Sequence, residues 1–198
     1  MKILITNFLT PEYSRIYYKT LSWWNCAVPD CKLYTVSEIC ENWPFDYNIS
    51  RLKNKCLDVA KKLKPDWMIL MPGIDSAIKS CPNFNTLDKN KIYYGHRVDN
   101  KLNNKQVASI HLYSNLVYEN YRYDERHAFY YDDLDFFFLK TKTVPKEKLD
   151  SLISVHLDHE ILPIKNEFVN NSFEKSKKIF EEDYKKEYNS FFSFELYF

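Results

Sequence analysis

The feature that most constrains the fold of this chain is a run of five large apolar residues, Trp67 to Met71. Because a half-exposed strand would alternate apolar and polar residues, the unbroken run predicts a β-strand that is buried on both faces. Pro72 and Gly73 follow the strand, and Asp75 comes shortly after them. In open α/β sheets ligands bind at the carboxyl ends of the strands, so this turn is a candidate phosphate or metal site.

A helix is predicted directly before this strand, over residues 49–63, and Pro65 ends it. Apolar residues recur through it at helical spacing: Ile49, Leu52, Cys56, Leu57, Val59, Ala60 and Leu63. Its basic residues are expected on the solvent side: Arg51, Lys53, Lys55, Lys61 and Lys62.

Shorter patterns predict the other elements of the chain. Strands are expected over 2–6, 32–36, 92–95 and 153–156, and helices over 13–24, over 145–152 and from residue 165 onward. The segment 110–118 fits either a strand or a short helix. A polar stretch that contains proline and asparagine runs from residue 76 to residue 90.

Composition limits the classes of function. The length of 198 residues suits one domain, and 28 Lys+Arg against 27 Asp+Glu give a net charge of +1, which is no footprint for duplex nucleic acid. Five cysteines without a Cys-x-x-Cys pair indicate reduced thiols rather than a structural zinc site. With two glycines the chain has no Walker loop and no Gly-x-Gly-x-x-Gly fingerprint, which argues against P-loop kinases and Rossmann dehydrogenases.

The expected location of the chain is the cytoplasm. No apolar run approaches the ~20 residues of a membrane span. The start of the chain, Met1 to Asn7, is too short an apolar stretch for a signal peptide.

The strongest chemical signal is a cluster of three acids among aromatic residues, Asp132, Asp133 and Asp135. Crowded carboxylates are costly unless a cation or proton donor offsets them. Two interpretations stay open. The acids open a helix whose dipole favours their charge, or one of them accepts a proton from a substrate hydroxyl while a neighbour orients it.

A second signal is the pair His156 and His159, which fits either a surface feature or part of a metal site. Asp75 together with a histidine would suit Mg²⁺ or Mn²⁺, because hard cations take carboxylate oxygens and Mn²⁺ also tolerates imidazole.

The order of these segments resembles that of nucleotide-sugar glycosyltransferases of the GT-A fold, family 2-like and of the inverting type, over roughly residues 1–171. Residues 51–60 are similar to the family's helix with an Arg-Asn pair, and 66–71 to the strand that leads into its Asp-x-Asp metal motif. Residues 123–136 resemble the acceptor-side segment that ends in Glu-Asp-x-Asp-Phe. Residues 155–159 resemble the closing His-x-x-His strand.

The resemblance implies a single α/β domain at 1–165, with a mixed central sheet flanked by helices, followed by a C-terminal helix and aromatic tail at 166–198. It implies Asp133 as general base beside Asp132, and Asp75 and His156 as ligands of Mn²⁺ or Mg²⁺. The residues expected to bind substrate are Arg51, Asn54, Thr6, Arg97, Tyr131 and Asp135.

One departure from the family pattern concerns the metal motif. The Asp-x-Asp position reads Gly73-Ile74-Asp75, so the first acid is missing. Asp75 would hold the metal with His156 and the substrate diphosphate, or Lys53, Arg51 or Arg97 would neutralise the phosphates without a metal.

The expected function is transfer of a sugar from a nucleotide-diphosphate sugar, most simply a UDP-sugar, to a glycan or other hydroxyl acceptor. The missing acid keeps one alternative open, a catalytically inactive GT-A-like domain that binds glycans or acts as a scaffold. A nucleotidyltransferase fits less well, because that class usually carries a Gly-rich loop after its first strand.

Overall fold

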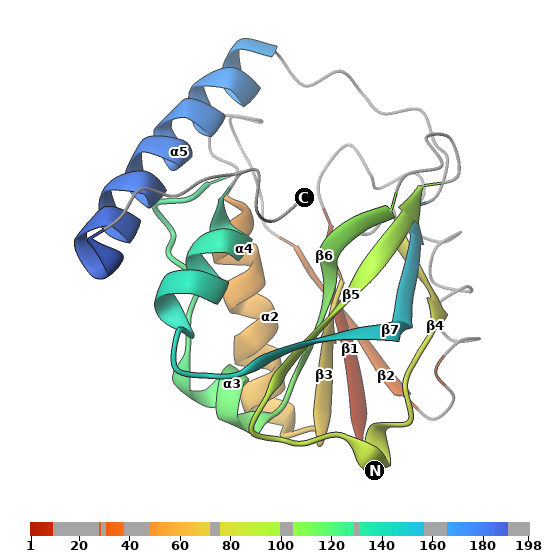
Figure 1. Cartoon of the computed structure of the whole chain (residues 1–198). Coiled ribbons are helices and arrows are strands. Elements are labelled where there is room, and N and C mark those ends of the chain that lie inside the picture. Colours follow the sequence, from red (N-terminus) through yellow and green to blue (C-terminus); the bar gives the residue numbers. More distant parts are fainter. Residues whose placement is uncertain are drawn as a thin grey trace.

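The computed structural model describes residues 1–9, 28, 31–37, 48–71, 76–99, 105–128, 131–156 and 166–189. These residues build a seven-stranded sheet in the order β2-β1-β3-β6-β5-β7-β4 (Figure 1). The strands are β1 (Ile3–Leu9), β2 (Cys31–Ser37), β3 (Trp67–Leu70), β4 (Ser76–Ser80), β5 (Ile92–Asp99), β6 (Lys105–Tyr113) and β7 (Lys146–His156).

The sheet is mixed, as expected. β1 lies between β2 and β3 and runs parallel to both, while β6 is antiparallel to β3 and to β5. β7 pairs in parallel with β5 and antiparallel with β4. Because β1 starts at the chain terminus at the bottom of Figure 1, the carboxyl ends of β1, β2 and β3 point to the top of that view.

The helices gather on one side of the sheet (Figure 1). They are α2 (Ile49–Leu63), α3 (Asn115–Asn120), α4 (Asp132–Asp135) with the π-helical turn η3 (Phe136–Lys140), and α5 (Asn166–Tyr188); a short 3₁₀ turn, η2, covers Phe84–Thr86. The C-terminal helix is therefore present. Within the described part of the chain no helix is both long and apolar enough to cross a membrane.

β3 is the centre of the core, and its four residues are all buried. Met68 and Leu70 face the side covered by α2, where they share an apolar cluster with Leu52 and Leu57. Trp67 belongs to a second cluster on the opposite face. The prediction of a strand buried on both faces is confirmed.

The predicted helix before β3 is also confirmed, with both its ends. Asn48 caps α2 by accepting a hydrogen bond from the Arg51 backbone N–H at 2.9 Å. Lys64 follows the last helical residue in the left-handed region, at φ 48°, and Pro65 comes next. A side-chain acceptor at the N-cap and a left-handed residue before proline are ordinary helix boundaries.

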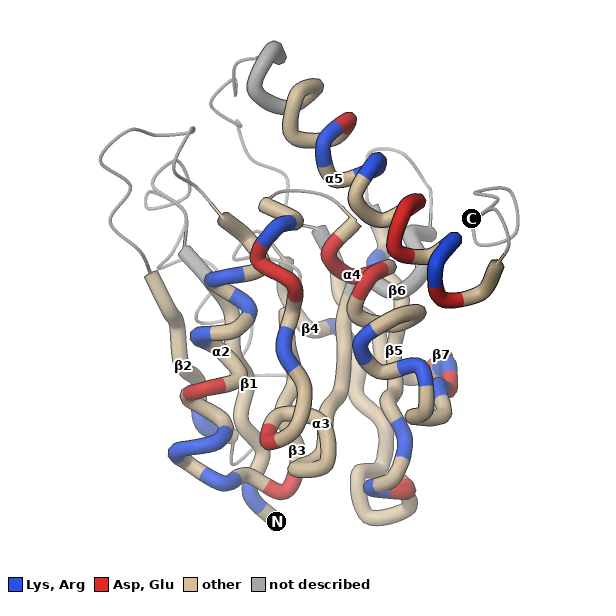
Figure 2. The backbone as a smooth tube through the Cα atoms, turned by 90° about the vertical axis from the view of Figure 1, so that its left-hand side faces the viewer, with Lys and Arg blue, Asp and Glu red and all other residues tan. Residues whose placement is uncertain are grey.

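Charged residues are frequent along α2 and α5 (Figure 2). The amphipathic helix expected from residue 165 onward corresponds to α5, which buries Ser176 and Phe180 and exposes most of its charged residues.

The other expectations about elements have different outcomes. The helix expected over 145–152 is wrong, because residues 146–152 form the first part of β7. The polar stretch 76–90 contains the short strand β4, and the segment 110–118 is both alternatives in turn, the end of β6 and then α3. The helix expected over 13–24 lies outside the described residues.

β7 shows why a local pattern failed there. Its first residues, Lys146-Glu147-Lys148-Leu149, are good helix formers. They pair instead with Ile92 to Tyr94 of β5, more than fifty residues earlier in the chain. Long-range pairing of this kind overrides local propensity.

Candidate functional site

Asp132 and Asp133 are the first two residues of the short helix α4 (Asp132–Asp135), and this position is compatible with either interpretation of the acids. Tyr131, just before them, lies in the left-handed region at φ 64°. Directly after the helix, Phe136 and Phe137 are buried in the apolar cluster that also contains Leu52 and Leu57 of α2. Packing on one side and a fixed turn on the other therefore hold the two acids against α2.

Lys53 of α2 lies between the two carboxylates. Its Nζ is 2.6 Å from Asp132 Oδ2 and 2.7 Å from Asp133 Oδ1. The ammonium also lies over the Tyr123 ring, 5.0 Å from the centroid, which is a cation–π distance. Lys53 is only 3% exposed, so its expected place on the solvent side of the helix is wrong.

The burial of Lys53 follows from its neighbours on α2. Residues three and four positions apart share a helix face, and Lys53 is followed at those spacings by Cys56 and Leu57, which are fully buried. Lys53 thus lies at the margin of the buried stripe. The sequence signal for a buried cation beside α4 was the acid cluster itself, because crowded carboxylates need a cation or proton donor nearby.

The charges of this triad, Lys53, Asp132 and Asp133, do not balance, because two carboxylates meet one ammonium. Burial acts to lower the pKa of Lys53, but the charges and hydrogen bonds of the two acids outweigh it, so this pKa lies above its ordinary value and Nζ stays cationic. Burial, aided by the charge of Asp133, raises the pKa of the Asp132 carboxyl against the opposing effect of Lys53. Both shifts favour a bound proton, as expected for a site with surplus negative charge.

Asp133 is the more accessible of the two acids. Its side chain is 37% exposed, against 7% for that of Asp132. Lys53 binds its Oδ1, and His111 Nδ1 of β6 lies 3.8 Å from the same oxygen. Within the described part of the chain, no hydrogen bond or ion pair involves Oδ2 of Asp133. One carboxylate oxygen is therefore fixed and the other is available to a ligand.

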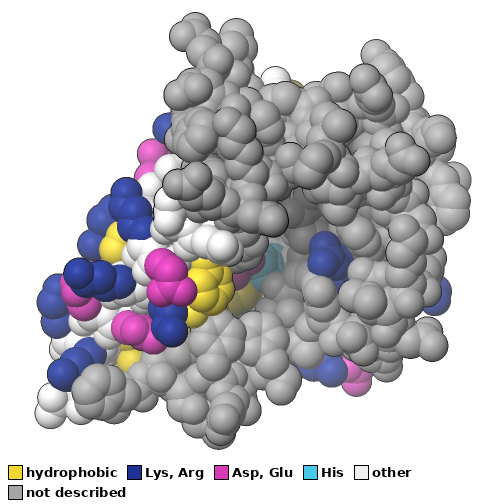
Figure 3. Space-filling model, turned by 90° about the horizontal axis from the view of Figure 1, so that it is seen from above, with side chains coloured by type: hydrophobic (Ala, Val, Ile, Leu, Met, Phe, Trp, Pro, Cys, Tyr) yellow, Lys and Arg dark blue, Asp and Glu magenta, His cyan; other side chains and the backbone are white. Residues whose placement is uncertain are grey.

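Aromatic rings surround this triad. The His111 ring lies 4.8 Å from that of Phe137, edge-on, and is stacked on Tyr113 at 5.8 Å. The hydroxyls of Tyr113 and Tyr123 share a hydrogen bond of 2.7 Å, and burial raises the pKa of both phenols. Seen from above, the molecule has a hollow where acidic, basic, apolar and histidine side chains meet (Figure 3).

Sequence reasoning missed His111. It lies within the apolar run Ile110 to Tyr113 of β6, and no local pattern distinguishes it from a core residue. Only the pairing of β6 with β3 and β5 brings it beside the acid pair.

Asn54 and Thr6, which were expected to bind substrate, form hydrogen bonds within the fold. The Asn54 amide donates to the carbonyl of Tyr123 and to Glu125 Oε1, both at 3.0 Å, and its oxygen accepts from the Tyr123 N–H at 2.8 Å. Thr6 is buried on β1, where its hydroxyl donates to the carbonyl of Ile69 at 3.3 Å. Asn54 thereby attaches α2 to the segment that leads to α4.

The other expected substrate contacts differ in accessibility. Arg51 on α2 and Arg97 on β5 are half-buried. Tyr131 is buried, with its ring 5.4 Å from that of Phe173 and 5.6 Å from that of Phe180, both of α5. Asp135 is fully buried, with Oδ1 3.8 Å from His127 Nε2.

The expected metal ligands are only partly described. Asp75 lies outside the described residues, and so does the side chain of His156. The backbone register pairs His156 of β7 with Ser76 of β4, the residue that directly follows Asp75 in the chain. The described side chains contain no group of three or more His, Cys, Asp and Glu that would hold a metal ion.

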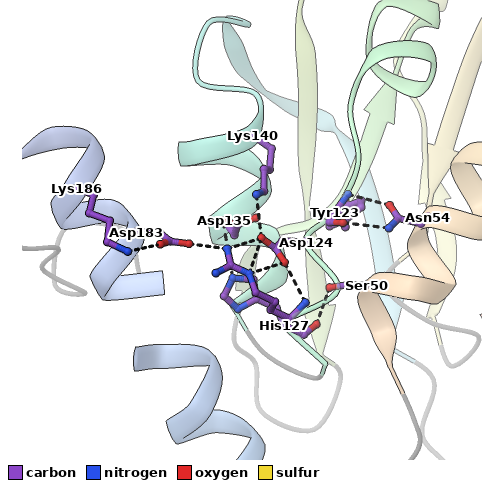
Figure 4. A network of polar contacts seen from close by, with 10 residues as sticks. Ser50, Asn54, Tyr123, Asp124, His127, Asp135, Lys140, Asp183 and Lys186 are labelled. Carbon is purple, nitrogen blue, oxygen red and sulfur yellow. Dashed lines mark hydrogen bonds and ion pairs between the residues drawn. The ribbon is translucent and has the colours of Figure 1, made fainter. Parts of the chain in front are cut away.

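A network of polar contacts connects α5 to residues 124–126 and to Lys140 at the end of η3 (Figure 4). Arg126 binds Asp124 through two nitrogens and reaches Asp183 of α5 at 2.6 Å, while Lys140 also binds Asp124. The hydrogen bonds from Arg126 lower the pKa of Asp124 well below its usual range. This network, Asp124-Arg126-Lys140-Asp183, fixes α5 against the end of η3.

No protein-family model matches the chain, and no curated protein matches its sequence. Among solved structures, the chain is similar to a glycosyltransferase involved in the glycosylation of the major capsid of PBCV-1. The TM-score is 0.49 with 11% sequence identity, over 90% of this chain and 99% of that chain. A likeness at this level does not by itself identify an activity.

Proposed function

We propose that this chain is an inverting glycosyltransferase that moves a sugar from a nucleotide-diphosphate sugar, most simply a UDP-sugar, to a hydroxyl of a glycan or other acceptor. The observation that carries the proposal is the state of Asp133. Lys53 binds one oxygen of this carboxylate, no hydrogen bond or ion pair from the described residues involves the other, and the side chain is 37% exposed. The sequence resemblance to GT-A glycosyltransferases assigns the general base to this same position.

Asp133 is the general base of the proposed reaction. Inverting transfer requires that the acceptor hydroxyl lose its proton while the bond to the leaving diphosphate breaks. The unpaired Oδ2 of Asp133 accepts that proton. Asp132 is buried on Lys53 and supports the arrangement without meeting the acceptor.

The donor side of the reaction needs positive charge at the diphosphate. Lys53 does not supply it, because two carboxylates already occupy its ammonium. The half-buried guanidinium groups of Arg51 and Arg97 are the remaining candidates from the metal-free alternative.

A divalent cation is the other possible source of positive charge. The donor set of one carboxylate and one imidazole suits Mn²⁺ better than Mg²⁺. Ser76, which follows Asp75, pairs with His156, and this register supports a shared site for the two residues. Asp75 and His156 would hold the ion, which when bound neutralises charge on the leaving diphosphate.

The domain division follows the same proposal. Residues 1–165 form the transferase domain, and residues 166–198 form an appendage that includes α5. The competing hypothesis is an inactive domain of the same fold, which would bind a sugar nucleotide or glycan without turnover.

The test combines binding with turnover. Wild-type protein is screened against UDP-, GDP- and dTDP-sugars, with and without Mn²⁺, for a rise in melting temperature and for release of the nucleoside diphosphate. A ligand that binds the folded state raises the melting temperature through linkage. We expect Asp133→Asn to retain the donor-induced shift and to lose transfer by at least about 10²-fold.

Asp58→Asn is the matched control, because it makes the same chemical change on α2 at an exposed ion pair with Arg122. It should transfer as the wild type does. Full turnover in Asp133→Asn would remove Asp133 from the base role. Donor binding without turnover by the wild type, with any acceptor offered, would favour the inactive domain.

A further inference from the structure

The ammonium of Lys53 is buried in contact with the proposed base, and the reaction described above gives it no role. A lysine that is 3% exposed is costly to bury, since an uncompensated charge leaves water at several kcal/mol. Its retention at this position therefore requires a specific arrangement of partners. The partners are Asp132 on one side, Asp133 on the other and the face of the Tyr123 ring.

The contacts of Lys53 divide the acid pair into two different groups. Asp132 is the buried counterion, at 2.6 Å. Among the described residues Asp133 is held through Oδ1 alone, at 2.7 Å, and this contact restricts rotation of its carboxylate. Asp133 belongs to a four-residue helix at the surface, and Asp135 of that helix is fully buried, so Lys53 and Asp135 hold its two ends.

We infer that Lys53 is a positioning residue that acts through Asp133: it fixes the orientation of this carboxylate and thereby presents Oδ2 to the acceptor hydroxyl. The inference rests on the proposed function and adds to it the residue that orients the base. Lys53 does not touch either substrate, because its ammonium is enclosed by the two acids and the Tyr123 ring.

His111 gives the inference a second contact. Its Nδ1 lies 3.8 Å from the same Oδ1 of Asp133 that Lys53 binds. The buried side chains of Lys53 and His111 therefore both approach Oδ1 of Asp133. None of the described side chains binds Oδ2 of Asp133. The two oxygens of this carboxylate therefore have different roles: Oδ1 is bound by the protein, and Oδ2 is the one that would accept the proton. Misplacement of a catalytic group by about 1 Å costs about 10²-fold in rate.

The test uses three variants and one control. Lys53→Met alone leaves Asp132 buried without a counterion and risks unfolding the chain. Lys53→Met/Asp132→Asn removes the buried charges together, so it should fold while Asp133 loses its anchor. Lys53→Arg keeps a cation at the site, and Asp132→Asn keeps Lys53 on Asp133. Lys61→Met changes an exposed lysine of the same helix and should behave as the wild type.

Steady-state kinetics with the donor found for the wild type give the readout. We expect Lys53→Met/Asp132→Asn to lose about 10²-fold in kcat with the donor KM unchanged. Asp132→Asn should lose less than about 10-fold, and Lys53→Arg should recover most of the loss seen in the double variant. A general weakening of the fold would not separate kcat from KM in this way, and it would not be rescued by arginine.

The possible failures are distinguishable. A folded double variant with wild-type kcat would overturn the positioning role and leave the proposed function intact. An equal loss in Asp132→Asn and in the double variant would assign the effect to Asp132 and overturn the role of Lys53. A wild-type chain that turns over none of the sugar nucleotides would overturn the proposed function, and the positioning role with it.

Discussion

The backbone of Tyr131 sets the direction of α4, the short helix that begins with Asp132 and Asp133. Tyr131 lies at φ 64° and ψ −1°, a left-handed conformation that costs a non-glycine residue about 1–2 kcal/mol. Its ring packs between Phe173 and Phe180 of α5, and this burial offsets the strain. A strained residue next to a candidate base is a pattern that functional sites often show.

A pair of substitutions separates the strain from the packing. Tyr131→Ala loses the ring and keeps the strain, while Tyr131→Gly loses the ring and removes the strain. We expect both variants to be less stable than the wild type, by about 2 kcal/mol or more for the lost ring. The glycine variant should exceed the alanine variant by about 1 kcal/mol in the free energy of unfolding, measured by urea titration. Alanine being the more stable of the two would contradict a left-handed Tyr131 in solution.

At the scale of elements, the junction of β5 and β7 depends on a close approach at Gly95. The register of both neighbours of β5 shifts between Tyr94 and His96, which places Gly95 at an irregularity. A Cβ added to Gly95 would lie 2.0 Å from the carbonyl oxygen of Leu152 and 2.8 Å from Ile110 Cγ2. The first neighbour is backbone, so it cannot move without separating the two strands.

We therefore expect Gly95→Ala to be among the most damaging single changes in the sheet. Overpacking of this kind costs about 1–3 kcal/mol where side chains can yield, and more where backbone must move. Circular dichroism during thermal unfolding should show a large drop in melting temperature. Lys148→Ala, an exposed change on β7, is the control and should unfold near the wild-type temperature. A Gly95→Ala protein as stable as this control would disprove the close contact.

The second junction between elements connects α5 to residues 124–126 and to the end of η3. It is formed by the network Asp124-Arg126-Lys140-Asp183. Hydrogen bonds from Arg126 lower the pKa of Asp124, and those from Arg126 and Lys186 outweigh burial to lower that of Asp183. A carboxyl whose folded-state pKa is depressed stabilises the fold above its unfolded value of about 3.9. That stabilisation is lost as the pH falls through the folded-state pKa.

The contribution of this network to stability should therefore depend on pH in the acidic range. We expect Asp124→Asn to lower the urea midpoint at pH 7, and we expect this deficit to narrow as the pH falls from about 4 towards 2, because the wild type then loses part of the stabilisation from its depressed pKa. The wild type should lose stability as the pH falls below about 4, and the variant should lose less over the same range. A deficit in the variant that stays equally large as the pH falls would indicate a packing effect instead of an ionic one.

At the scale of the whole molecule, the sequence predicted the elements whose residues pack locally. The bounds of α2 and the doubly buried β3 follow from apolar spacing, a capping Asn48 and Pro65. The sequence did not predict β4 or the length of β7, because these strands are stabilised by partners far away in the chain.

The residues of the candidate site also fall into two groups, those that a local sequence pattern indicates and those that only folding brings to the site. The acids at 132 and 133 stand out in the sequence, because crowded carboxylates are a local signal. Lys53 and His111 do not stand out, since one resembles a solvent-facing helix lysine and the other a residue of an apolar strand. Folding brings them to the acids from distances of roughly eighty and twenty residues along the chain, and no spacing rule covers that.

A crystal structure of the Asp133→Asn variant with a UDP-sugar and Mn²⁺ would show whether Asp133 acts on a sugar nucleotide. We expect the diphosphate and the ion beside Asp75 and His156, with the anomeric carbon facing residue 133 across a space that fits one acceptor hydroxyl. A UDP-sugar bound on another face of the molecule, or with its anomeric carbon turned away from residue 133, would remove Asp133 from the base role.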